Sequence, residues 1–293
     1  MKILFVGSVV FSEKILKQLI YLKANIVGVC TLKSSEANSD FCDLKAICEE
    51  FNIPAKYTND INSDQSIAWI GTLNPDIIFC FGWSRLLKKK LLNLAPMGVV
   101  GYHPASIPNN RGRHPIIWSL VLGLKETSST FFFMDEGADS GDILSQVSLP
   151  ILYEDDATSL YNKLISIAIS QISDFLPLLE KNKFKRIPQD HSLSNYWRKR
   201  NINDGKIDWR MSSESIYNLI RGLTWPYPGA HFEYNGNQYK AWKSKVILKK
   251  IINIEPGKII SASNDGIIVK TGDNLINLTK IEPEIDIVNG SYL

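Results

Sequence analysis

The sequence predicts an α/β protein with an N-terminal Rossmann-like domain, built on a parallel sheet, and a smaller C-terminal β-barrel-like domain. For the first domain, β-rich apolar runs at 2–6 and 25–31 enclose a run at 12–22 whose apolar residues recur with helical spacing. This β-α-β order predicts parallel strands. For the second domain, short alternating runs after residue 230 are separated by Asn-Gly, Pro-Gly and Asp-Gly turns, which is typical of β-hairpins.

The remaining elements follow from the spacing of apolar residues. Helices are expected where these residues recur every three or four positions, over 43–51, 61–73, 116–122, 157–179 and 212–219. Strands are expected at the short apolar runs near 53–55, 75–81, 97–100, 131–134 and 143–147. We expect a catalytic domain at 1–182, a polar linker rich in Lys and Arg at 183–202, and a C-terminal β-rich domain at 203–293.

Composition limits the possible partners. A net charge of +3 over 293 residues argues against a strongly cationic nucleic-acid binder, so we expect no stable nucleic-acid partner. The four cysteines form no C-x-x-C pair, so we expect no metal site. No apolar run is long enough to cross a bilayer, and the chain begins with a strand-like run, so we expect a cytoplasmic protein without a membrane partner.

Two predicted strand-end loops carry the candidate catalytic side chains. One contains His103, in a segment rich in Pro, Asn and Gly, and the other contains Asp139 in an acidic turn. Loops at strand ends are where α/β proteins usually place their chemistry. A dinucleotide-dependent dehydrogenase is disfavoured, because Gly7 stands alone after the first strand where the G-x-G-x-x-G motif would be.

Three pieces of the stretch 98–143 carry a resemblance to a known family: His103 with Ser106-Ile107-Pro108, then Arg111-Gly112-Arg113, then Ala138-Asp139-Ser140-Gly141-Asp142-Ile143. They resemble the catalytic region of the folate-dependent formyltransferases. The pieces Asp-Gly-Lys-Ile-Asp-Trp from 204 and Trp-Pro-Tyr-Pro-Gly-Ala from 225 resemble the start of the C-terminal domain in the methionyl-tRNA and sugar members. Glycinamide ribonucleotide formyltransferase lacks this domain and is disfavoured.

The resemblance implies transfer of a formyl group from N10-formyltetrahydrofolate to an amine, with His103 and Asp139 as the catalytic pair. The implied folate-binding residues come from two loops: Phe81, Gly82, Trp83, Arg85, Leu86, Leu87, Asp135, Glu136, Gly137 and Ala138. The implied substrate-binding residues are Tyr102, Asn109, Asn110, Arg111 and Arg113. Some of these residues also have a purely structural interpretation. Trp83 and its two leucines can cover a sheet edge, and Asp139 can form a turn.

One position departs from the family pattern. Gly101 stands where the family usually has an Asn that helps to hold the formyl oxygen. A backbone N–H, a water, Asn109 or Asn110 would have to replace that side chain.

For the acceptor we favour a nucleotide-linked amino sugar of surface-glycan biosynthesis, because the net charge is small and the sequence of residues 109–124 looks closest to that of sugar-directed members. The alternatives are a methionyl-tRNA formyltransferase, a folate-binding homologue without catalysis, and a formyl-folate hydrolase. A homodimer is possible.

Overall fold

The computed structural model describes residues 1–35 and 39–293, which form two compact units. The first unit consists of Met1–Pro115, Thr127–Leu149 and Asn162–Trp197. The second consists of Ile116–Glu126, Pro150–Tyr161 and Arg198–Leu293. The predicted limits at 1–182, 183–202 and 203–293 stay a prediction.

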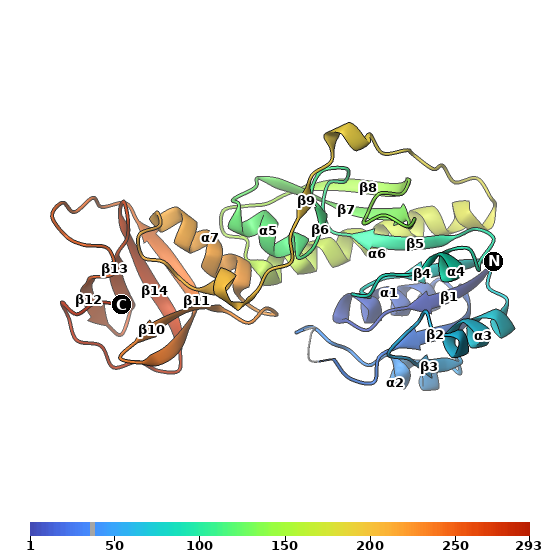
Figure 1. Cartoon of the computed structure of the whole chain (residues 1–293), viewed down its shortest axis with the longest axis horizontal. Helices are drawn as coiled ribbons and strands as arrows, with labels where there is room; N and C mark the ends of the chain where they lie inside the picture. The colour runs from blue at the N-terminus through green and yellow to red at the C-terminus, as the bar shows by residue number, and fades with distance from the viewer. Residues whose placement is uncertain (36–38) are drawn as a thin grey trace. The chain divides into compact units, whose positions relative to one another are not determined.

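A seven-stranded sheet organises the first unit (Figure 1). Its strand order is β3-β2-β1-β4-β5-β7-β8. The strands are β1 (Lys2–Val6), β2 (Asn25–Thr31), β3 (Ala55–Tyr57), β4 (Ile77–Cys80), β5 (Val99–His103), β7 (Glu126–Phe133) and β8 (Ile143–Pro150). The five strands β1 to β5 are parallel, and β7 runs antiparallel to β5. Strands β1 and β4 are almost wholly apolar, as expected for strands covered on both faces.

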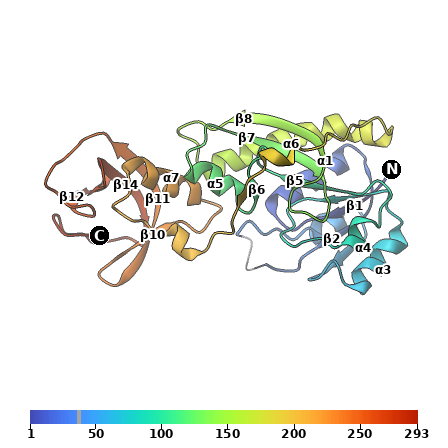
Figure 2. The same cartoon turned by 45° about the horizontal axis from the view of Figure 1, so that its top comes forward.

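Helices cover both faces of this sheet: α1 (Val10–Tyr21), α2 (Lys45–Glu50), α3 (Asp64–Leu73), α4 (Lys89–Leu92) and α6 (Ala157–Glu180). Phe11 of α1 stacks on Tyr102, and Phe175 of α6 packs edge-on against Phe79, which places both helices on one face. The opposite face carries Ile78 and packs with Ile70 of α3 and Leu91 of α4. Figure 2 shows α6 along β7 and β8.

The alternation of side chains fixes the face on which each strand residue lies. Successive residues of a strand point to opposite faces, so His103 shares a face with Val99, while Tyr102 points to the face covered by α1. Predicted site residues can therefore contact one another only if their side chains lie on the same face of the sheet.

Helix α5 (Pro115–Val121) begins at Pro115, one residue before the predicted range, at a position that suits proline because its missing N–H has no intrahelical partner there. Two short strands lie where the sequence predicts only loops: β6 (Arg111–Gly112) pairs in parallel with β9 (Tyr196–Trp197). Among the described residues, no helix combines the length and apolar character of a membrane span.

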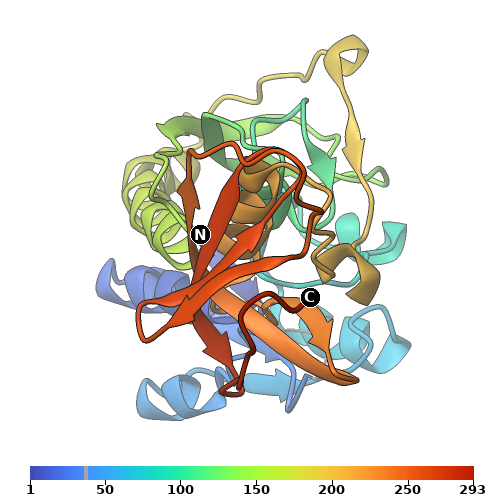
Figure 3. The ribbon, with the colours of Figure 1, turned by 90° about the vertical axis from the view of Figure 1, so that its left-hand side faces the viewer.

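The second unit contains a five-stranded antiparallel sheet in the order β10-β11-β14-β13-β12. Its strands are β10 (Ala230–Tyr234), β11 (Asn237–Ile247), β12 (Ile259–Ser263), β13 (Gly266–Lys270) and β14 (Leu275–Glu282). Helix α7 (Ser213–Leu223) packs against β11 and β14 and appears behind the strands in Figure 3. Ser212 caps this helix by accepting a hydrogen bond from the Ser215 amide, as predicted. The predicted fold class, an α/β domain followed by a smaller β domain, is confirmed.

Candidate active site

The structure brings His103 and Asp139 together. His103 is the last residue of β5 and only 4% exposed, and its Nδ1 lies 3.5 Å from Oδ2 of Asp139. His103 Nε2 lies 2.7 Å from the carbonyl oxygen of Asn110. Because a carbonyl only accepts hydrogen bonds, Nε2 is the donor in this contact, and Nδ1 is the ring nitrogen that faces the carboxylate.

The Asp139 carboxylate is held by the backbone of the neighbouring loop. The Gly112 amide donates a 2.9 Å hydrogen bond to Asp139 Oδ2, the oxygen that faces His103. Asp139 has a φ of 54°, and Asn110 has a φ of 65°. Non-glycine residues rarely adopt this left-handed conformation, and they keep it only where surrounding contacts impose it.

Gly101, which stands where the resemblance expects an Asn, has little free space around it. A Cβ atom on Gly101 would lie 2.8 Å from Met134 Cγ and 3.1 Å from Phe132 Cζ. The space beside this position is therefore filled by Met134, and a larger side chain at 101 requires Met134 to move.

The predicted folate residues fall into two loops that an ion pair connects. Lys89, at the start of α4, lies 3.2 Å from Glu136 of the acidic turn. Leu86 is 77% exposed, while Leu87 is buried. The remaining residues of the acidic turn, Asp135, Gly137 and Ala138, are exposed.

The loop after β4 contains a buried polar atom without a partner. Trp83 Nε1 is shielded from solvent and makes no hydrogen bond within the described part of the chain. Gly82 has a φ of 70°, and a Cβ there would lie 2.3 Å from Val9 Cγ2, so only glycine lets this loop pass so close. A buried N–H that lacks a partner fits a ligand with a hydrogen-bond acceptor at this place.

Two predicted site residues point into the core instead. Phe81 is fully buried, stacks on Phe79, and can offer a ligand only its backbone. Tyr102 stacks on Phe11 and accepts a hydrogen bond from Ser129 on the face of the sheet opposite to His103. Burial raises the pKa of Tyr102 well above its ordinary value. The parity of β5 thus places the Tyr102 side chain on the face opposite to His103, and its role in substrate binding stays a prediction.

The other predicted substrate residues differ in exposure. Asn109 and Arg113 are exposed, and Arg113 Nη1 lies 3.4 Å from the Ser84 carbonyl, which brings this loop near the loop after β4. Arg111 is 1% exposed, and its guanidinium is held by protein groups in the interior. Arg85 is exposed and Asn110 half-buried.

The segment 187–197, assigned to a linker by the sequence, contributes the buried Gln189 and the exposed Asn195 to contacts with the site loops. Gln189 is 6% exposed and donates to the backbone carbonyls of Asp139 and Gly141. Asn195 Oδ1 accepts a hydrogen bond from the Asn110 amide. No local pattern in this polar segment predicts these contacts.

Arg198 and Arg200, which follow the linker strand β9, have partners inside the second unit. Arg198 forms an ion pair with Asp204, and this pair holds the pKa of Asp204 well below its usual range. Arg200 donates to the Asp204 carbonyl and lies 4.7 Å from the Trp118 ring.

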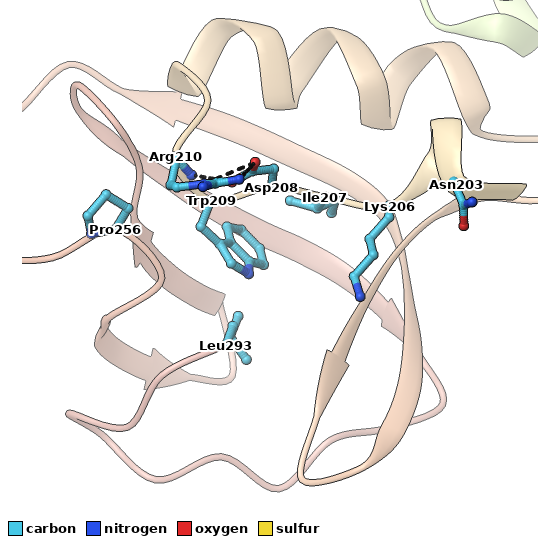
Figure 4. A pocket seen from close by; sticks show the side chains of 8 residues that line it. All are labelled: Asn203, Lys206, Ile207, Asp208, Trp209, Arg210, Pro256 and Leu293. Atoms are coloured by element: carbon cyan, nitrogen blue, oxygen red, sulfur yellow. Dashed lines mark hydrogen bonds and ion pairs between the residues drawn. The ribbon is translucent and has the colours of Figure 1, made fainter.

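A hollow of about 520 Å³ lies elsewhere in the second unit (Figure 4). Its lining residues are Asn203, Lys206, Ile207, Asp208, Trp209, Arg210, Pro256 and Leu293. Its cations are neutralised, because Arg210 pairs with Asp208 and Lys206 with Glu233. Within the described residues, no group of three or more His, Cys, Asp or Glu side chains is placed to hold a metal ion.

Comparison with known proteins gives the family. Residues 1–174 match the family model described as "Formyl transferase", and residues 201–290 match "Formyl transferase, C-terminal domain". The chain is 34% identical over 288 residues to a methionyl-tRNA formyltransferase of Alkaliphilus oremlandii, which covers 96% of this chain and 92% of the relative.

Two solved structures share the fold at low identity. WlaRD, a sugar 3N-formyltransferase crystallised with dTDP and 5-N-formyl-tetrahydrofolate, has a TM-score of 0.72 at 19% identity and covers 97% of this chain and 99% of its own. The N-formyltransferase of Helicobacter canadensis, in complex with folinic acid and dTDP-3-aminofucose, has a TM-score of 0.72 at 18% identity and covers 95% and 99%. With the family models spanning most of the sequence and a relative above 30% identity along nearly its whole length, the chain belongs to the formyltransferase family.

Proposed function

We propose that the protein transfers the formyl group of N10-formyltetrahydrofolate to the amine of a nucleotide-linked amino sugar, with His103 and Asp139 as the catalytic pair. The observation that supports this most directly is the buried His103 with its Nδ1 3.5 Å from the Asp139 carboxylate. The family membership supplies the reaction class.

His103 is arranged to accept a proton. Its Nε2–H is held by the Asn110 carbonyl, and its Nδ1 faces a carboxylate oxygen that can only accept a hydrogen bond. The Asp139 carboxylate is therefore placed to stabilise a proton on Nδ1. In the reaction the amine attacks the formyl carbon, the amine proton passes to His103, the bond from the formyl carbon to N10 breaks, and His103 returns the proton to N10 as it leaves. Asp139 stabilises the imidazolium that forms.

The loops after β4 and β7 are proposed to hold the folate. Trp83 Nε1 supplies a buried donor, and the exposed Leu86 offers an apolar surface to a flat ring. The ion pair between Lys89 and Glu136 holds the two loops at one place. Both neighbours described above were crystallised with a formylated tetrahydrofolate, which is consistent with this donor.

A nucleotide-linked amino sugar is favoured as acceptor by the charge of the chain. A protein that binds a long nucleic acid neutralises many phosphates, whereas a sugar nucleotide carries one diphosphate that one or two cations can bind. The net charge of +3 fits the smaller anion. The exposed Arg113, near the Ser84 carbonyl, is the cation we propose for it.

Methionyl-tRNA is the second candidate acceptor. The 34% identity to a methionyl-tRNA formyltransferase over 288 residues favours it. A non-catalytic folate-binding homologue is the third possibility, since Gly101 lacks a side chain that could hold the formyl oxygen.

Acceptor assays separate the three. Purified protein is mixed with formyl-tetrahydrofolate and with UDP-, dTDP-, GDP- or CMP-linked amino sugars or methionyl-tRNA, and release of tetrahydrofolate is measured. We expect turnover with one class of sugar nucleotide and none without an amine. Turnover only with methionyl-tRNA would replace the sugar assignment. Folate binding without turnover on any amine would reduce the protein to a binding homologue, and formate release without an amine would identify a hydrolase.

A further inference from the structure

Gln189 and Arg111 form a buried pair between the two loops of the candidate active site. Arg111 donates to Gln189 Oε1 from Nε at 3.1 Å and from Nη2 at 2.6 Å. Gln189 Nε2 donates to the carbonyl oxygens of Asp139 at 2.9 Å and Gly141 at 2.6 Å. The side-chain amide thus joins the segment of β6 to the loop of Asp139.

The orientation of this amide is determined by its neighbours. Both lone pairs of Oε1 accept from a guanidinium, and both protons of Nε2 go to carbonyls, so all four hydrogen bonds of the amide are made. A flipped amide would place donors against donors and acceptors against acceptors. The pair therefore has one stable arrangement.

Arg111 is a buried cation whose partners are an amide, a phenol and an imidazole. Besides Gln189, its Nη1 donates to Tyr196 Oη at 2.9 Å, and Nη2 lies 3.1 Å from His191 Nδ1. Burying a charge costs free energy unless the charged group is fully hydrogen-bonded. Because its donors bind these protein groups, the Arg111 guanidinium is not available to bind a substrate.

The backbone around Arg111 contacts both catalytic side chains. The Asn110 carbonyl accepts from His103 Nε2, and the Gly112 amide donates to Asp139 Oδ2. Gln189 holds the other side of Asp139 through its carbonyl. Since Asp139 has a φ of 54°, its conformation depends on such contacts.

We propose that Gln189 is a positioning residue: oriented by Arg111, its amide fixes the backbone of Asp139 and so the distance between the Asp139 carboxylate and His103. This inference rests on the proposed function only for its kinetic readout. Its structural readout is independent of any substrate.

The decisive variant is Gln189→Glu. It keeps the size of the side chain and the contact with Arg111 but removes the two N–H donors to Asp139 and Gly141. Gln171→Glu is the control for a carboxylate at another buried amide: Gln171 donates to Ser129 O at 3.1 Å and Ser145 Oγ at 2.8 Å in the same unit, away from the catalytic pair, while its Oε1 has no hydrogen-bond partner within the described residues.

Two measurements test the inference. Hydrogen exchange at the Gly112 amide, which donates to Asp139, should become at least about tenfold faster in Gln189→Glu than in Gln171→Glu. With an accepted amine, kcat should fall on the order of 10²-fold in Gln189→Glu while KM for the folate and the acceptor stays within about threefold, because misplacing a catalytic group by about 1 Å has this effect.

The outcomes separate the inference from the proposed function. Wild-type exchange at Gly112 together with wild-type kcat in Gln189→Glu overturns it, and so do equal losses in the Gln171→Glu control. If wild-type protein formylates no amine, the proposed function fails, and the exchange rate of Gly112 alone decides whether Gln189 positions Asp139.

Discussion

His103 Nδ1 and the Asp139 carboxylate face each other across 3.5 Å, and the Gly112 amide donates to the same carboxylate oxygen. This distance is longer than that of a good hydrogen bond. A carboxylate beside an imidazole favours the protonated form of the ring. The proposed catalytic role of the pair depends on this contact.

Replacing either member of this pair should mainly lower kcat. We expect His103→Asn and Asp139→Asn to reduce kcat by about 10²- to 10⁴-fold, the usual contribution of acid–base catalysis, with little change in folate affinity. Steady-state kinetics and folate titration measure both effects. Asp174→Asn, an exposed carboxylate on α6, serves as control. Retained activity in both site variants would remove the pair from the mechanism.

His231 should make the stability of the second unit depend on pH. Burial is the main cause that lowers the pKa of His231 below its ordinary 6.5, and the charges of Lys206 and Lys240 lower it further. The folded state therefore disfavours the protonated form. The contribution of neutral His231 to the free energy of unfolding is therefore fully present above pH 6.5. It is lost as the pH falls from 6.5 through the lower pKa of the folded state, by at most about 1.4 kcal/mol per pH unit.

Urea unfolding at pH 7.5 and pH 5.5 checks this expectation. The loss of unfolding free energy on acidification should be smaller in His231→Gln than in wild type. Equal losses in wild type and His231→Gln would contradict the prediction.

Strands β6 and β9 form the smallest sheet of the protein and lie against its candidate site. Gly112 of β6 has a φ of 106°, and a Cβ there would lie 2.3 Å from the carbonyl oxygen of Trp197. Neither the backbone conformation nor the space therefore permits a side chain.

Gly112→Ala should displace β6 and with it the amide that holds Asp139. We expect a stability loss of about 2 kcal/mol or more, from strain and overlap together, and a clear fall in kcat. Gly236→Ala is the control, because Gly236 has a φ of 77° but open space around it, so it reports the strain alone. Thermal unfolding and kinetics compare the two variants, and similar behaviour of both would show that the close approach to Trp197 is unimportant.

The elements of the protein follow closely from the spacing of its apolar residues. Helix α6 begins at Ala157, as predicted, and α5 begins at Pro115, one residue before the predicted range 116–122. The strand β9 and the burial of Gln189 were not predictable, because they depend on contacts between residues 78 to 85 positions apart in a polar segment without periodicity. The side-chain direction of Tyr102 could have been predicted, since the alternation of β5 sets it opposite to His103.

At the scale of the whole molecule, the small net charge predicts weak dependence on salt. With a nucleotide-linked sugar we expect kcat/KM to change by less than about threefold between 50 and 200 mM NaCl, because few charges are neutralised on binding. A tRNA acceptor that uses many phosphate contacts would lose about 10³-fold or more in affinity over the same range. Initial rates at fixed pH measure this, and a steep dependence would favour the tRNA reading.

The family model for the N-terminal part ends at residue 174, yet Gln189 and β9 lie beyond it. Under the role proposed for Gln189, the residues that position Asp139 therefore extend past the end of that family model. Chimaeras that exchange C-terminal halves among relatives therefore need their junction after Trp197. An earlier junction would take Arg111 from one parent and the residue at position 189 from the other, and the hydrogen bonds between Arg111 and Gln189 could be lost.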